Sequence, residues 1–100
     1  MEPGVPESNW SGPFSVSADV TWRDAPAEII LFDAGAERYH VLNEQAAEIW
    51  RLLAGGASVS AAARQLSARY GAGQAEIEAD VAELARDLVG RGLLSPEPPT

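Results

Sequence analysis

The sequence predicts a small α+β domain, in which a three-stranded antiparallel sheet is followed by three helices in a winged helix-turn-helix-like arrangement. The first observation is a change of hydrophobic period. Apolar residues follow strand-like patterns up to Leu42, and after Asn43 they recur at helical spacing. The second is that only short links join these segments, as in small α+β domains. A chain of 100 residues with 46% hydrophobic residues is enough for one domain with a modest core.

The two ends of the chain differ in composition from the middle. Residues 1–14 contain three prolines and two glycines, and residues 95–100 are rich in proline, so both predict flexible segments. The domain itself is expected to span residues 15–94. Trp10 lies in the N-terminal arm, and two interpretations stay open for it. It is either a loop aromatic tucked on the surface, or part of an arm that folds over a neighbouring molecule or over the domain.

Three strands are expected in the first half. From Ser15 to Trp22 apolar and polar residues alternate, which indicates a strand with one buried face, and residues 23–26 form a turn. Glu28 to Asp33 contains four consecutive apolar residues, so this strand is predicted to be central and buried on both faces. A hairpin connection at residues 33–36 places Gly35 where a positive φ is needed. The third strand runs from Glu37 to Leu42.

Asn43 is predicted to end this third strand and to cap the first helix. Its side-chain oxygen can accept a hydrogen bond from the backbone N–H groups that open a helix. The helix runs from Glu44 to about Ala54 and ends at a glycine pair. A strand held in this way has a fixed register. If it is also an edge strand, another chain can pair with it.

Two further helices follow. The second is capped by Ser58 or Ser60 and stops at Gly71. The third begins near Gln74 or Ala75, has acids in its first turns and arginines near its end, and finishes before Gly92. Its apolar stripe and the residues after it complete the core. The two tryptophans on apolar faces, Trp22 and Trp50, are also expected to be buried there.

The composition and the net charge of the sequence exclude several classes of function. The formal net charge is −8, with seven arginines and no lysine, which argues against nucleic-acid binding because a duplex is a polyanion. There is no cysteine, so disulfides, thiolate metal sites and a cysteine nucleophile are excluded. The sequence also lacks an apolar run of 18 residues and an N-terminal secretory signal. We therefore expect a cytoplasmic protein that does not bind membranes.

Nothing in the sequence indicates an enzyme. His40 is the single histidine, and the serines Ser58, Ser60 and Ser67 fall in helix caps or on a helix face, without the context of a catalytic triad. The acids of the third helix are interpreted as a solvated face rather than as a catalytic pair. They are Glu76, Glu78, Asp80, Glu83 and Asp87. No catalytic residue, cofactor or metal is expected.

One series of residues extends through most of the chain. It begins with Arg38-Tyr39-His40-Val41-Leu42-Asn43, Ala47, Ile49-Trp50 and Leu52-Leu53. It continues with Gly55-Gly56, Val59, Tyr70-Gly71, Asp80-Val81, Leu84, Leu88 and Gly92-Leu93-Leu94. With these residues in this order, the sequence resembles the PqqD family of small peptide chaperones, also called RiPP recognition elements, from about Val16 to Leu94. The family fold is a three-stranded sheet with three helices and is winged-helix-like.

The resemblance implies a non-catalytic protein that binds the leader of a ribosomally made precursor peptide and presents it to modifying enzymes. The leader adds as a strand to the third strand, beside the third helix. On this chain the implied peptide-binding residues are Glu37, Arg38, Tyr39, His40, Val41, Leu42, Asp80, Val81, Leu84, Asp87, Leu88 and Arg91. The sequence looks most like the B1 proteins of lasso-peptide pathways, whose partners are a leader peptidase and an ATP-dependent cyclase. The family member that serves pyrroloquinoline quinone biosynthesis has the same architecture.

Two other functions are weighed against this one. A winged-helix DNA-binding regulator fits the helix-turn-helix outline, but its recognition helix should present Arg or Lys outward, and here the third helix carries acids. A small hydrolase built on His40 is the other alternative.

Overall fold

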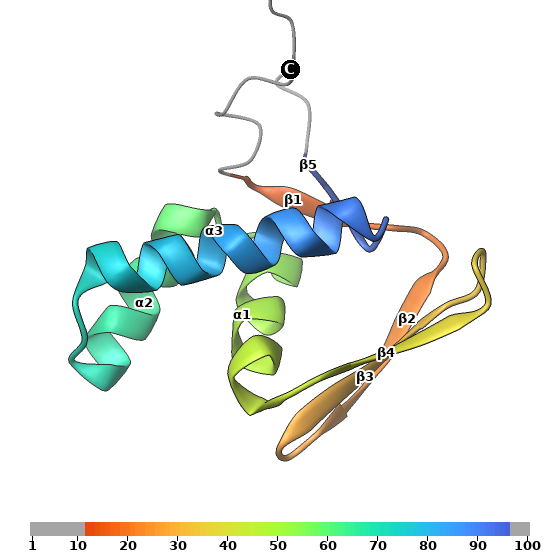
Figure 1. The fold of residues 1–100 in the computed structure, drawn as a ribbon, viewed down its shortest axis with the longest axis horizontal. Coiled ribbons are helices and arrows are strands. Elements are labelled where there is room, and N and C mark those ends of the chain that lie inside the picture. Colours follow the sequence, from red (N-terminus) through yellow and green to blue (C-terminus); the bar gives the residue numbers. More distant parts are fainter. Residues whose placement is uncertain (1–11, 97–100) are drawn as a thin grey trace, which may run out of the picture.

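The computed structural model describes residues 12–96 and confirms the α+β class (Figure 1). Its larger sheet is antiparallel, with the order β2-β3-β4, and three helices pack beside it. The elements are β1 (Phe14–Val16), β2 (Val20–Ala25), β3 (Glu28–Asp33), β4 (Arg38–Leu42), α1 (Glu44–Ala54), α2 (Val59–Tyr70), α3 (Gln74–Gly90) and β5 (Leu94–Pro96). The helix-turn-helix likeness of α2 and α3 stays a prediction.

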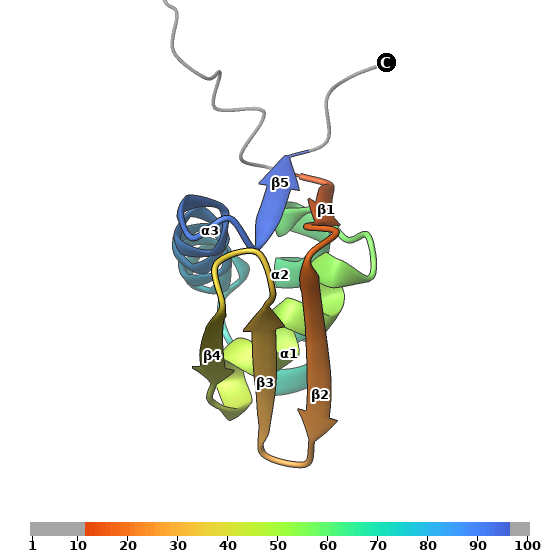
Figure 2. The same ribbon diagram turned by 90° about the vertical axis from the view of Figure 1, so that its right-hand side faces the viewer.

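The single first strand expected from residues 15–22 is wrong, because the chain turns in its middle. A turn after Ser17 separates β1 from β2, with the Val20 N–H donating to the Ser17 carbonyl at 3.1 Å. β1 pairs with β5 in a small second sheet, where Val16 lies opposite Leu94 (Figure 2). β2 continues to Ala25 instead of ending in a turn at residue 23. The alternation persists through the turn because residues on both sides of it, such as Phe14 and Val20, contribute to the same core.

Strands therefore include residues that the sequence assigned to the arm and to the tail. Phe14 begins β1 and lies opposite Pro96, and Ser15 lies opposite Ser95, so both tail residues belong to β5. Phe14 is buried in the core. The remaining positions of the arm and the tail, Trp10 among them, lie outside the described residues.

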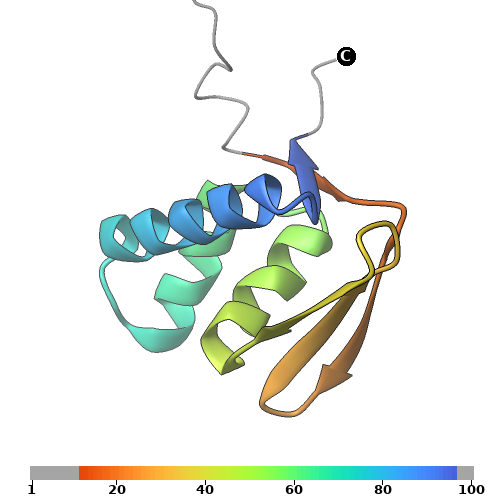
Figure 3. The same cartoon turned by 45° about the vertical axis from the view of Figure 1, so that its right-hand side comes forward.

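The helices cover only one face of the larger sheet. Figure 3 shows all three on the same side of β2-β3-β4. In β3, Ile29 and Leu31 face these helices and are fully buried, whereas Ile30 and Phe32 point to the other face and are half-buried. The expectation that β3 is buried on both faces is wrong, because no second layer lies over its outer face in residues 12–96.

The two tryptophans have different environments. Trp50 of α1 is fully buried at the centre of the core, as expected. Trp22 is 43% exposed, so its assignment to the core is wrong. It lies on β2, at the edge of the sheet, where its ring packs edge-to-face on Trp50 with the centroids 5.3 Å apart. The edge position leaves the rest of the indole without neighbours to cover it.

Helix capping follows the sequence closely. The Asn43 side chain accepts from the Ala46 N–H at 2.9 Å and starts α1 directly after β4, as predicted. Ser58, rather than Ser60, caps α2 by accepting from the Ala61 N–H at 3.1 Å. Gly71 ends α2 in the left-handed conformation, with a φ of 70°.

The β3–β4 hairpin differs in detail from the prediction. Its residue with positive φ is Glu37, at 57°, and not Gly35. Glu37 is thus the last residue of the turn, and β4 begins one position later than expected. A Cβ at Gly35 would lie 2.7 Å from a carboxylate oxygen of Asp19, so the exposed Asp19 side chain would have to move to accommodate it.

Replacing the cap residue should destabilise the domain without changing its fold. For Asn43→Ala we expect the free energy of unfolding to fall by about 1 kcal/mol, because the Ala46 N–H loses its acceptor. Urea denaturation followed by circular dichroism measures this difference. Asn43→Asp is the control and should keep most of the stability. Equal losses in the two variants would show that the side-chain cap does not stabilise α1.

Candidate functional site

The outer edge of β4 carries the main feature expected of a peptide-binding site. β4 is the last strand of the β2-β3-β4 sheet, and within residues 12–96 no strand pairs with its outer edge. Figure 2 shows this edge on the side of the sheet that lies toward α3. Unpaired backbone N–H and C=O groups in such a row are a template for another extended chain.

A hollow of about 200 Å³ lies beside this edge. It is bounded by β4, by the first turn of α1 and by the C-terminal half of α3, and we call it the β4–α3 groove. Its lining residues are His40, Val41, Leu42, Asn43, Ala46, Asp87, Leu88, Arg91 and Leu93. Half of the twelve residues that the sequence assigned to peptide binding are among them.

A polar bridge crosses the rim of the β4–α3 groove. Arg91 of α3 donates from Nη1 to Nδ1 of His40 on β4, at 3.2 Å. The direction is fixed because a guanidinium has no acceptor. Arg91 also forms an ion pair with Asp87, at 3.1 Å from Nε to Oδ2, and both side chains are half exposed. These three residues therefore link the edge strand to α3 at the mouth of the groove.

A second hollow, of about 460 Å³, lies farther along α3, between its N-terminal half and the helices α1 and α2. Its floor is apolar, with Ile49, Leu66 and Val81 buried. Glu76 and Asp80 on its wall are exposed and form no ion pair with another described residue. Such a hollow suits an apolar side chain or a long basic one.

The third carboxylate at this second hollow, that of Glu48, already has partners. Arg69 forms an ion pair with it at 2.8 Å, and the Tyr70 hydroxyl donates a hydrogen bond to it. This hydrogen bond raises the pKa of the Tyr70 phenol, because losing the proton would leave two anions in contact. Glu48 thus holds the end of α2 against α1.

The other predicted binding residues lie in different surroundings. Val81 and Leu88 are at most 1% exposed, so they form the floor under the groove region and contribute mainly to the core. Leu84 is half-buried, packs against the core and lines neither hollow. Tyr39 lies on the outer face of the sheet, while Glu37 and Arg38 are exposed at the hairpin end of β4.

Sequence reasoning missed three lining residues, which are Asn43, Ala46 and Leu93. The signal for the first two is present in the sequence. A helix that starts directly after an edge strand must place its first turn at the end of that strand. Leu93 could not be recognised in this way, because only the return of the chain after α3 brings it to the groove.

The structure places the candidate metal ligands and two of the three candidate serines. No group of three or more His, Asp or Glu residues is placed to hold a metal ion in this part of the chain. Ser58 is occupied as a helix cap, and the Ser67 hydroxyl donates to the Ala72 carbonyl at 2.6 Å. Among residues 12–96 there is also no helix that is both long and apolar enough to span a membrane.

Comparison with known proteins agrees with this architecture. No curated protein sequence matches the chain. Two solved structures are similar to it, each with a TM-score of 0.77 over 85% of this chain. One is TbiB1 in complex with the TbiA(beta) leader peptide, at 22% identity and with 99% of its chain covered. The other is a lasso peptide synthetase B1 complexed with the leader peptide, at 26% identity and with 100% covered.

A family model places the sequence more directly. The model described as coenzyme PQQ synthesis protein D matches residues 28–94, which is more than half of the chain. The matched region runs from β3 to β5 and includes the free edge of β4, the β4–α3 groove and the second hollow. The chain therefore belongs to the PqqD family.

Proposed function

We propose that this chain is a non-catalytic RiPP recognition element, which binds the leader of a ribosomally made precursor peptide as an added strand on β4. The observation that carries the proposal is the free edge of β4 directly beside the β4–α3 groove. Family membership supports it, as do the two similar structures, since each is a complex with a leader peptide. The pathway we propose is lasso-peptide biosynthesis in the cytoplasm, with a leader peptidase and an ATP-dependent cyclase as partners.

The free energy of binding cannot come from backbone pairing alone. About four hydrogen bonds, at about 0.5–1.5 kcal/mol net each, contribute only a few kcal/mol. Ordering a flexible leader costs about 1–2 kcal/mol per residue, so the two terms nearly cancel. One or two large apolar side chains, at about 1.5–3 kcal/mol each, would tip the balance toward binding.

The structure offers two places for such side chains. The β4–α3 groove lies next to the edge and takes the residues of the added strand that point toward α3. The second hollow lies toward the N-terminal half of α3, and Glu76 and Asp80 there, which form no ion pair within residues 12–96, would attract a basic leader residue. Side chains in these hollows, rather than the backbone ladder, would select one leader over another.

The alternative of DNA binding is not favoured by the structure. A recognition helix needs cations on its exposed face. The exposed positions of α3 instead include Glu76, Asp80, Glu83 and Asp87, against the single arginine Arg86, while Arg91 at the end of the helix is already paired with Asp87. The hydrolase alternative is also not favoured, because His40 contacts Arg91 rather than a nucleophile.

Direct binding tests the proposal. Fluorescently labelled leader from the precursor encoded beside this gene is titrated with the full chain, and the TbiA(beta) leader serves as a second probe. We expect saturable binding of the first probe, measured by fluorescence polarisation. A short DNA duplex at low salt is the comparison. No binding of either leader at millimolar protein, or tighter binding of the duplex, would overturn the proposal.

Proline in β4 should abolish leader binding. The N–H groups of Tyr39 and Val41 share one direction along the strand, and we expect this direction to be the free edge. Tyr39→Pro and Val41→Pro each remove one donor and place a ring at the edge. The controls Tyr39→Thr and Val41→Thr keep the donor. If both proline variants fold by circular dichroism and bind the leader normally, the leader does not pair with β4.

Filling the β4–α3 groove should also block the leader. Ala46 lines this groove from the first turn of α1, so we expect Ala46→Phe to weaken leader binding at least tenfold. Glu44→Phe is the matched control, since Glu44 lies in the same turn but lines neither hollow. Polarisation titrations compare the two after a check of thermal stability. Equal affinities would mean that no leader side chain enters the groove.

A further inference from the structure

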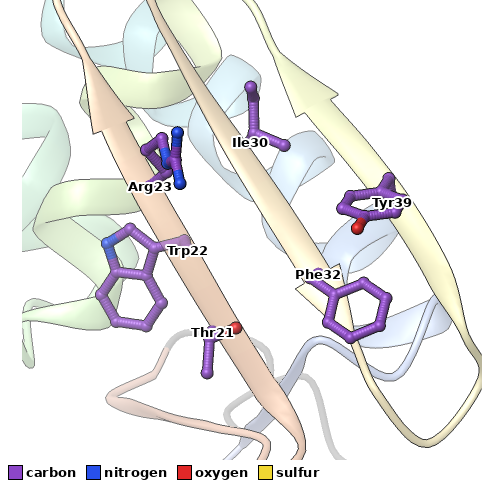
Figure 4. A pocket seen from close by; sticks show the side chains of 6 residues that line it. All are labelled: Thr21, Trp22, Arg23, Ile30, Phe32 and Tyr39. Carbon is purple, nitrogen blue, oxygen red and sulfur yellow. The ribbon is translucent and has the colours of Figure 1, made fainter.

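The alternation of side chains along β4 decides which side chains of an added strand enter the β4–α3 groove. Residues that lie directly opposite each other in paired strands share one face of the sheet. His40 and Leu42 face the helices, because their partners in β3 are fully buried on that side. Tyr39 lies opposite Phe32 on the outer face, and Figure 4 shows their rings together, with centroids 4.7 Å apart. A leader strand on β4 therefore points every second side chain into the groove, opposite His40 and opposite Leu42.

These two positions of the groove differ in chemistry. Leu42 and the buried Leu88 and Leu93 give the groove an apolar floor, which suits an apolar leader side chain. At His40, two residues earlier in β4, the lining is polar instead, since Arg91 reaches it from α3 and is paired there with Asp87. An added strand therefore meets an apolar position opposite Leu42 and a polar position opposite His40.

The Arg91 side chain keeps hydrogen-bond donors free for a ligand. A guanidinium has five N–H donors and no acceptor. Its Nε lies 3.1 and 3.2 Å from the two carboxylate oxygens of Asp87, and Nη1 donates to Nδ1 of His40 at 3.2 Å. The remaining N–H groups, on Nη1 and Nη2, have no partner among residues 12–96. Two N–H groups of this planar fork match the two oxygens of a carboxylate.

A leader side chain opposite His40 would lie within reach of the Arg91 guanidinium. Directly opposed residues of paired strands have Cβ atoms about 4.5–5.5 Å apart. The leader strand adds between β4 and the wall that α3 forms, so this side chain points to the place where Arg91 crosses to His40. The ion pair with Asp87 is no obstacle, because both side chains are half exposed and surface pairs of this kind contribute little to stability.

Charge selects the kind of leader residue that fits opposite His40. A lysine or arginine there would be repelled by Arg91, and an apolar side chain would keep water from the unpaired donors without replacing it. A carboxylate forms charge-assisted hydrogen bonds with them. The chain has a formal net charge of −8, and Glu76 and Asp80 line the second hollow, so an acidic leader residue is disfavoured elsewhere on the site.

We propose that Arg91 is a specificity-determining residue that recognises a carboxylate of the leader, and this rests on the proposed function. The carboxylate belongs to an Asp or Glu opposite His40. An apolar leader residue two positions away lies opposite Leu42. His40 acts through Arg91, because its Nδ1 accepts from the guanidinium and holds it across the groove. The leaders that this domain selects therefore contain an apolar residue and an acid separated by one residue.

The experiment varies the leader and the domain together. The probes are labelled synthetic copies of the leader encoded beside this gene, in which each residue in turn is replaced by Glu, Gln or Lys. Each peptide is titrated by fluorescence polarisation with the full chain as wild type, Arg91→Gln or Arg91→Glu. Arg86→Gln is the matched control, because Arg86 lies on the same helix, is exposed, lines no described hollow and forms no ion pair in residues 12–96.

We expect one leader position at which Glu binds the wild type at least fivefold more tightly than Gln and tenfold more tightly than Lys. Two positions away, replacing an apolar residue by Gln should weaken binding. Arg91→Gln should reduce the preference for Glu to within twofold, and Arg91→Glu should invert it in favour of Lys, which a loss of structure cannot do. His40→Phe should narrow this preference at the same position and at no other, whereas Arg86→Gln should leave it unchanged.

Leader binding without a preference for Glu at any position, or with a preference that persists in Arg91→Gln, overturns this inference alone. A preference four residues from the apolar position also overturns it, since the acid would then lie opposite Arg38. An equal loss of affinity for every peptide in Arg91→Gln would show that Arg91 contacts the leader backbone instead. Failure of the wild type to bind any of the peptides overturns the proposed function.

Discussion

The direct passage from β4 into α1 at Asn43 is the constraint on which the site depends. The Asn43 side chain caps α1 at the residue where the strand ends, so no loop separates an edge strand from the first helical turn. The register of β4 against β3 comes from the pairing of the two strands, and the cap places Ala46 beside the strand end. The cap thus joins two walls of the groove, the edge of β4 and the first turn of α1, while the C-terminal half of α3 supplies the third.

Because the domain is small, the apolar residues of α3 are mostly needed in the core, and few of them remain for the site. A domain of this length needs nearly all of its apolar stripe for its own stability. Val81, Ala85 and Leu88 are accordingly buried, and α3 packs against α2, β5 and α1. The residues of α3 that remain accessible to a ligand lie at the rims of the two hollows. Asp80 lies at the second hollow, and Asp87 and Arg91 lie at the β4–α3 groove. A leader bound as proposed would therefore depend on backbone pairing and on shallow apolar floors.

Local signals in the sequence were sufficient to predict the structure at positions where one residue determines it. The Asn43 cap, the Gly71 helix end and the order of β3, β4 and the three helices follow from such signals. The split of residues 15–22 into two strands could not be predicted, because its cause is the distant pairing of Val16 with Leu94. The exposure of Phe32 likewise depends on how many layers cover the sheet, and that of Trp22 depends on its position at the sheet edge. The apolar pattern of the sequence encodes neither.

The same limit applies to the outer face of the β2-β3-β4 sheet. Apolar residues at Ile30, Phe32 and Val41 predict a buried strand when only the sequence is considered, since burial is the usual reason for them. Within residues 12–96 no second layer covers this face, so Ile30 and Phe32 are only half-buried and Val41 is 63% exposed. A run of apolar residues therefore predicts a strand, but it does not predict how many faces of that strand are covered.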